Sequence, residues 1–269
     1  MSATADLEYA LSDTEVRAIA DAAGVQSLPT VLTVAPRPGS TPSSSAALDA
    51  TAARLSARGL IAGGLVNDDL CDVLMTLQRP DRELAMRLVT PDGIARLSVV
   101  RRGGRGVMAR RVGDRYLLRP LSEAGLRSAT RVILGELPAA EAAAIDAVGA
   151  PLDVMAESLG DTHDGRLIAD RLCALGAESR AAMLIGSALA ARRAFAEIVY
   201  FALAAERDRV ERGPAAVAVL YTKRGRILAS PSASPSGQFW TTLKPGTDHA
   251  IAAAVGQLVG LSDEGWEGP

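Results

Sequence analysis

The sequence is poor in the residue types on which most catalytic and metal sites depend. The 269-residue chain has two cysteines and two histidines. Cys71 and Cys173 lie far apart, without the Cys-x-x-Cys or Cys/His spacing of a zinc site or a disulfide framework. His163 and His249 fall at expected helix starts, and no Gly-x-Ser-x-Gly elbow surrounds a serine. We therefore expect no enzyme, no metal and no cofactor, unless a deep pocket brings a carboxylate to one of the histidines.

Aromatic residues are also scarce, at 3% of the chain, and this scarcity bears on nucleic-acid binding. Arginines gather between residues 96 and 119, where a basic sheet could bind phosphates. Apart from Tyr116, however, this region has no ring on which bases could stack. We predict no nucleic-acid partner. The arginines either bind a protein partner or lie on the solvent face of a sheet, paired with acidic helices.

No apolar run approaches the roughly 18 residues that a membrane span needs. Glu197 and the pair Arg192-Arg193 interrupt the most apolar region, and four acidic residues precede the first basic one, Arg17, which is the wrong polarity for a signal peptide. The sequence therefore predicts a cytoplasmic protein without stable membrane insertion. A hydrophobic fraction of 48% can fill a real core, and we expect one domain over residues 1–269.

The first half of the chain predicts helices followed by an antiparallel meander. Ser12-Asp13-Thr14-Glu15 fits a capping box, and Gly24 marks the end of the helix that it starts. Next we expect a strand over 28–34, a loop over 36–45, and helices over 46–58 and from Asn67 to Pro80. Glycine-rich turns then separate four strands, before a helix over 122–137. The predicted strands cover 84–90, 94–101, 107–112 and 116–119.

The second half repeats this order. Arg171 to Gly176 mirrors Arg54 to Gly59, and a helix over 178–193 precedes a second meander and a closing helix. Its strands cover 195–203, 216–221, 226–230 and 238–243, and the closing helix covers 247–261. We infer an internal duplication, with halves at about 46–138 and 161–261 and an alanine-rich connector over 139–160; chance agreement between two α+β segments is the alternative.

If the halves are copies, their meanders can meet edge to edge about a pseudo-two-fold axis. The predicted fold class is α+β, with a central, mainly antiparallel sheet and helices over one face or at its ends. We expect Phe195, Val199 and Phe201 to fill the core. At most one of Phe239 and Trp240 should be buried, and Trp266, in a tail rich in Gly, Glu and Asp, should be disordered.

Several segments together resemble the EspG family of ESX (type VII) secretion chaperones. They include Arg58-Gly59-Leu60, Thr222 to Arg226, and Trp240 to Gly246 before the last helix. The resemblance implies a central sheet with N-terminal and C-terminal helical bundles and quasi-two-fold symmetry. It also implies a cytosolic chaperone that binds the PPE subunit of PE/PPE heterodimers and keeps them in solution for export, without enzymatic activity, metal or nucleotide.

We nominate the residues of a partner-binding site only from their positions in the predicted fold, because the family has no invariant contact motif that could be matched to this sequence. They lie in the first hairpin loop and in the second meander: Arg101, Arg102, Arg105, Glu197, Tyr221, Arg224, Arg226 and Ser230. The competing hypothesis is a regulatory or scaffolding module that associates with itself through a sheet edge, as a possible homodimer, and leaves PPE proteins untouched.

Overall fold

The computed structural model describes residues 7–33, 45–160, 162–204, 206 and 208–268. Its centre is a ten-stranded antiparallel sheet with the order β1-β7-β6-β5-β4-β9-β10-β11-β12-β8. The strands are β1 (Tyr9–Ser12), β4 (Arg82–Thr90), β5 (Gly93–Arg102), β6 (Arg105–Val112), β7 (Arg115–Leu121), β8 (Val148–Pro151), β9 (Ala194–Ala204), β10 (Arg209–Thr222), β11 (Gly225–Ala233) and β12 (Phe239–Pro245). A separate small hairpin pairs β2 (Ile61–Ala62) with β3 (Leu65–Val66).

Two meanders, β4 to β7 and β9 to β12, meet edge to edge, as predicted. The central pair is β4 and β9, whose antiparallel register places Arg82 opposite Ala202 and Val89 opposite Phe195. The outer strands of the sheet are β1 and β8, with four residues each. Joining the meanders therefore removes two long free edges and leaves only short ones.

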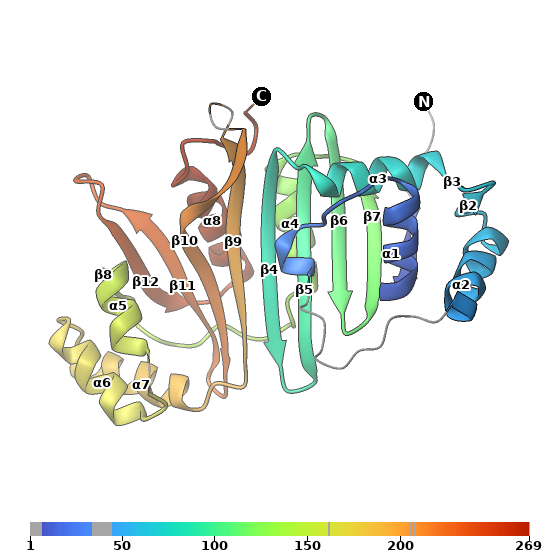
Figure 1. Cartoon of the computed structure of the whole chain (residues 1–269). Helices are drawn as coiled ribbons and strands as arrows, with labels where there is room; N and C mark the ends of the chain where they lie inside the picture. Colours follow the sequence, from blue (N-terminus) through green and yellow to red (C-terminus); the bar gives the residue numbers. More distant parts are fainter. Residues whose placement is uncertain (1–6, 34–44, 161, 205, 207, 269) are drawn as a thin grey trace.

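Helices lie on both faces of the sheet (Figure 1). Two bundles flank one face, which we call the bundle face. The N-terminal bundle has α1 (Asp13–Ala22), the 3-10 helix η1 (Thr30–Leu32), α2 (Ser45–Ala57) and α3 (Asp68–Gln78). The C-terminal bundle has α5 (Leu152–Leu159), α6 (Gly165–Ala174) and α7 (Ser179–Ala190). The opposite face, which we call the helix face, is covered by α4 (Leu126–Glu136) and α8 (Asp248–Gly260).

Local capping explains where several helices start. The predicted capping box is confirmed: the Ser12 hydroxyl accepts from the Glu15 amide, and the Glu15 carboxylate accepts from the Ser12 amide. Burial alone would raise the pKa of Glu15, but these hydrogen bonds and the nearby Arg58 lower it. The side chains of Asn67 and Thr247 cap α3 and α8. The sequence thus determines these helix starts locally.

Alternating strand residues divide the core between the two faces. On the helix face, Leu84, Ile198 and Val219 pack against Ile133 of α4 and Val255 of α8. On the bundle face there are two separate clusters, one beneath each bundle. The middle of the bundle face, over β4 and β9, lies between these clusters.

Some predicted elements are wrong. Residues 30–32 form η1 in place of the predicted strand over 28–34, and most of the predicted loop over 36–45 lies outside the described residues. The helix predicted from residue 122 begins at Leu126. The connector over 139–160 contributes β8 and α5, because β8 pairs with β12 and continues the sheet.

The predicted burial of the aromatic side chains also needs correction. Trp266 is 2% exposed and belongs to the core of the helix face, so it is not disordered. Phe195, Val199 and Phe201 are only partly buried, whereas the alternate residues of β9, which include Ile198 and Tyr200, fill the core. The sequence prediction therefore chose the wrong one of the two apolar faces of β9 as the buried face.

Candidate partner-binding surface

The middle of the bundle face presents an apolar surface between the two bundles, and no helix lies in front of the middle of β9 (Figure 1). We define the central patch by six side chains: Arg87 and Val89 on β4, and Phe195, Glu197, Val199 and Phe201 on β9. Because opposite residues of an antiparallel pair point to the same face, the register places Val89 beside Phe195 and Arg87 beside Glu197.

The neighbouring strand β10 adds small side chains next to this patch. Ala218 is opposite Glu197, and Ala216 is opposite Val199. The register shifts at a bulge between Arg212 and Ala216, and on the other side of this bulge Arg212 is opposite Phe201. The small side chains of Ala216 and Ala218 therefore lie beside the larger apolar residues of β9 on the same face of the sheet.

Arginines surround the single carboxylate of the central patch. Glu197 lies 3.5 Å from Arg87 and 3.8 Å from Arg212. The guanidinium groups of Arg87 and Arg192 each lie over the Phe195 ring, 5.6 Å from its centroid. The surface is therefore apolar along β9 with cationic borders, and it favours an apolar segment flanked by acidic residues.

The first hairpin loop does not join this surface. Arg102 donates to the Met75 carbonyl oxygen at 2.9 Å, and Arg105 pairs with Asp72 at 2.9 Å, so both attach α3 to the sheet. Both arginines are exposed. Arg101 points to the helix face and donates to the carbonyl oxygens of Trp266 and Gly268.

Three of the nominated residues in the second meander are buried beneath α8. Arg226 is 6% exposed and pairs with Asp248 at 2.6 Å, and the Ser230 hydroxyl donates to Gln257 at 2.9 Å. Burial raises the pKa of Tyr221, against the opposing effect of the Arg226 guanidinium. These side chains hold α8 on the sheet, so they are not open to a partner in this conformation.

Of the nominated residues in the second meander, Glu197 lies in the central patch and Arg224 is exposed in the β10–β11 turn. Sequence reasoning missed Arg87 and Arg212, and it assigned Val199 and Phe201 to the core. The alternation of Phe195, Val199 and Phe201 was a usable signal. It was ambiguous because the other face of the strand is apolar as well.

The residues considered for catalysis do not form a site in the described part of the chain. His163 and His249 are exposed near the starts of α6 and α8. Within the described ranges, no group of three or more His, Cys, Asp or Glu side chains could hold a metal ion. No helix among those residues is long and apolar enough to cross a membrane.

The fold defines a class: an α+β protein with a broad antiparallel sheet that has helices on both faces. A protein-family model described as the EspG family matches residues 12–257. The chain belongs to the EspG family, a group of secretion chaperones, and this agrees with the non-enzymatic role predicted from the sequence.

Two similar proteins carry the name ESX-3 secretion-associated protein EspG3. The protein from Mycolicibacterium smegmatis is 30% identical over 257 residues, which cover 89% of this chain and 82% of the relative. The protein from Mycobacterium tuberculosis is 26% identical over 264 residues, which cover 92% of this chain and 88% of the relative. The likeness therefore extends over most of each protein.

A solved structure shares the fold. It is the Mycobacterium tuberculosis type VII secretion system chaperone EspG5 in complex with the PE25-PPE41 dimer, with a TM-score of 0.80 and 18% sequence identity. The match covers 96% of this chain and 98% of that chain. The predicted family and the α+β fold with a central antiparallel sheet are confirmed, although helices cover both faces of the sheet and both bundles lie on the same face.

Proposed function

We propose that this protein is a cytoplasmic chaperone that binds the PPE subunit of a PE/PPE heterodimer and keeps it in solution for ESX secretion. The observation that carries the proposal is the partly exposed apolar strip along β9, with Phe195, Val199 and Phe201, in front of which no helix lies (Figure 1). Membership in the EspG family and the complex described for EspG5 support it. Covering an exposed apolar tip prevents aggregation without any input of energy.

The central patch and the neighbouring C-terminal bundle form the contact surface in this proposal. Its cationic borders, Arg87, Arg192 and Arg212, would attract acidic residues beside the apolar tip and set its orientation. Glu197 and Arg224 remain candidates for direct contact. Tyr221, Arg226 and Ser230 would act indirectly, by positioning α8 behind the sheet.

The exposed arginines of the first hairpin loop, Arg102 and Arg105, remain candidates at the edge of a larger interface. A specific complex covers about 800 Å² on each partner, which is more than β9 alone offers. The loop lies on the side of the N-terminal bundle, through its bonds to Met75 and Asp72. The contribution of Arg102 and Arg105 to the binding free energy would be modest, because a partner would compete with their existing bonds to Met75 and Asp72.

The whole chain, on this proposal, is one domain built by duplication, with halves related by a pseudo-two-fold axis between β4 and β9. Element order supports it: a short edge strand runs into a helix in each half, as β1-α1 and as β8-α5. Each half continues with further helices, a four-stranded meander and a closing helix. This order would extend the copies beyond 46–138 and 161–261 to include β1 and β8.

Co-expression with a PE/PPE pair encoded in the same genome tests the function. We expect size-exclusion chromatography with light scattering to show a 1:1:1 complex, with the PPE protein in solution only when the chaperone is present. Pairs from other loci are the control for specificity. If the folded chain elutes alone with every pair, the chaperone function is wrong; a homodimer in that experiment would favour the self-associating module.

A further inference from the structure

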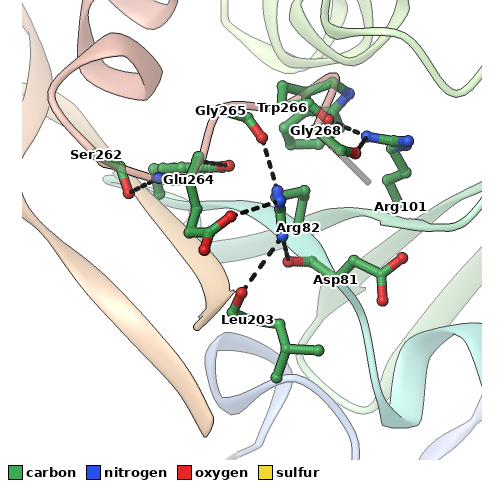
Figure 2. A network of polar contacts seen from close by, with 10 residues as sticks. Asp81, Arg82, Arg101, Leu203, Ser262, Glu264, Gly265, Trp266 and Gly268 are labelled. Atoms are coloured by element: carbon green, nitrogen blue, oxygen red, sulfur yellow. Dashed lines mark hydrogen bonds and ion pairs between the residues drawn. The ribbon is translucent and has the colours of Figure 1, made fainter. Parts of the chain in front are cut away.

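The C-terminal segment 262–268, which we call the tail, crosses the helix face from the end of α8 to the first meander (Figure 2). Side chains of three neighbouring strands donate to its main-chain carbonyl oxygens. Tyr200 on β9 donates to Glu264 at 2.7 Å, and Arg82 on β4 donates to Gly265 at 2.7 Å. Arg101 on β5 donates to Trp266 and, at 2.8 Å, to Gly268.

The tail inserts one large side chain into a fitted pocket. Trp266 is 2% exposed, and its Nε1 donates to the Ala124 carbonyl oxygen at 2.8 Å. Its ring lies 6.2 Å from the ring of Tyr200, centroid to centroid. A buried tryptophan with its polar atom satisfied is typical of an anchor residue in peptide recognition.

Two carboxylates of the tail meet positive groups of the protein. Glu264 pairs at 3.0 Å with Arg82, whose side chain is 2% exposed. Glu267 accepts at 2.9 Å from the Leu126 amide in the first turn of α4. The N-cap residue of α4 is Gly125, which has no side chain to cap the helix, so the tail supplies the cap.

The tail is held by side chains and is not a strand of the sheet. Within the described residues 263–268, no backbone-to-backbone hydrogen bond joins the tail to a strand. Its release would therefore leave the ladder between β4, β5 and β9 complete. Side-chain donors to the main chain of the tail, one anchor pocket and two sites for carboxylates together make the arrangement of a bound peptide.

We propose that Arg82, Arg101, Tyr200 and the Trp266 pocket form a peptide-binding groove, and that the tail is its resident, exchangeable ligand. The groove takes an acidic segment with tryptophan after glycine, as in Glu264-Gly265-Trp266-Glu267. Release of the tail removes the cap of α4 and opens the pocket beside Ala124, which couples occupancy of the groove to the packing of the helix face. This inference does not depend on the proposed chaperone function.

A shortened chain, residues 1–261, and a synthetic peptide of residues 262–268 test this proposal by isothermal titration calorimetry. We expect one peptide to bind per chain, and about thirtyfold weaker binding for the peptide with Trp266→Ala. Arg101→Ala in the shortened chain should weaken binding too. Arg131→Ala, an exposed α4 residue, is the matched control and should leave binding unchanged.

The full-length chain provides a second control, because its own tail competes at an effective concentration of about 1 mM. Peptide binding to the full-length chain should therefore be weaker by about the ratio of 1 mM to the Kd of the shortened chain, which is about a hundredfold for a Kd of about 10 μM. Equal binding to both chains, or no binding to a folded shortened chain, would overturn the proposal.

If the shortened chain does not fold, the same groove can be tested in the folded full-length protein. A protease site inserted between Leu261 and Ser262 allows the tail to be cut from the intact protein. We expect the cut tail to exchange with a fluorescent peptide of residues 262–268, with the fold retained. Unfolding upon cleavage, or a cut tail that never exchanges, would make the segment a fixed part of the core and the proposal wrong.

Discussion

At the scale of single residues, the most unusual ionisable group is Glu83 on β4. It is 5% exposed, and the Ser98 hydroxyl donates to its carboxylate at 2.7 Å. Burial raises its pKa to about 7, although the hydrogen bond from Ser98 lowers it. Register places Glu83 opposite Phe201, at the end of the central patch. A carboxyl group here is favoured in its neutral form.

The raised pKa of Glu83 makes stability depend on pH. Between pH 4.5 and about 7 the folded chain holds a proton that the unfolded chain releases, so the free energy of unfolding should fall as pH rises. The loss should reach about 3 kcal/mol at most. Glu83→Gln should remove this loss and stabilise the protein at pH 8, as measured by urea unfolding at several pH values.

Every other ionisable group is the same in the two proteins. The difference between the parent and the Gln variant therefore isolates Glu83. If both proteins lose stability in parallel from pH 5 to pH 8, Glu83 is ionised in both states and the assignment fails.

At the scale of elements, the C-terminal bundle depends on one close contact between α6 and α7. Gly165 and Gly186 face each other, and a Cβ atom on Gly186 would clash with the main-chain oxygen of Gly165. A Cβ atom on Gly165 would lie 2.9 Å from the Gly186 oxygen. The two backbones can approach this closely only because both residues lack a side chain.

Gly186→Ala should separate α6 from α7 and destabilise the protein by about 2 kcal/mol or more. The matched control is Gly256→Ala in α8, where a Cβ atom would meet nothing within 4 Å. That change should stabilise the protein by up to about 1 kcal/mol, through helix propensity. Urea unfolding followed by circular dichroism compares the two, and equal effects would contradict the close contact.

At the scale of the whole molecule, two meanders and three separate cores leave the middle of one face open. The N-terminal bundle covers the outer strands on one side, and the C-terminal bundle covers those on the other. The helix face is closed by α4, α8 and the tail. This asymmetry between the faces supports the proposal of an interface along β9; on β4, Ala85 and Glu83 of the same face are buried.

Val199→Glu places a charge in the central patch and should weaken binding of a cognate PE/PPE dimer at least about tenfold, because the carboxylate would lose its water in the complex. The matched control is Val112→Glu at the end of β6, where the side chain is already 40% exposed. Calorimetric titration measures binding, and circular dichroism checks the fold. Parent-like affinity in both variants would move the interface away from β9.

The sequence by itself determined the local elements of this protein. Both meanders, the Asn67 cap, the capping box of Ser12 and Glu15, and the glycine ends of the helices follow from side-chain chemistry within a few residues. Gly59 and Gly176 do adopt positive φ, as helix-ending glycines should. The family likeness also lies in such short segments and in their order.

Only the tertiary structure decided which surfaces are open and which are filled. Both faces of β9 are apolar, so period-two alternation could not say whether Ile198 or Val199 lies inside. Arg226 is buried because α8 folds over it, and Trp266 is buried because Arg82, Arg101 and Tyr200 hold the tail. These contacts join residues far apart in the chain, and no local pattern encodes them.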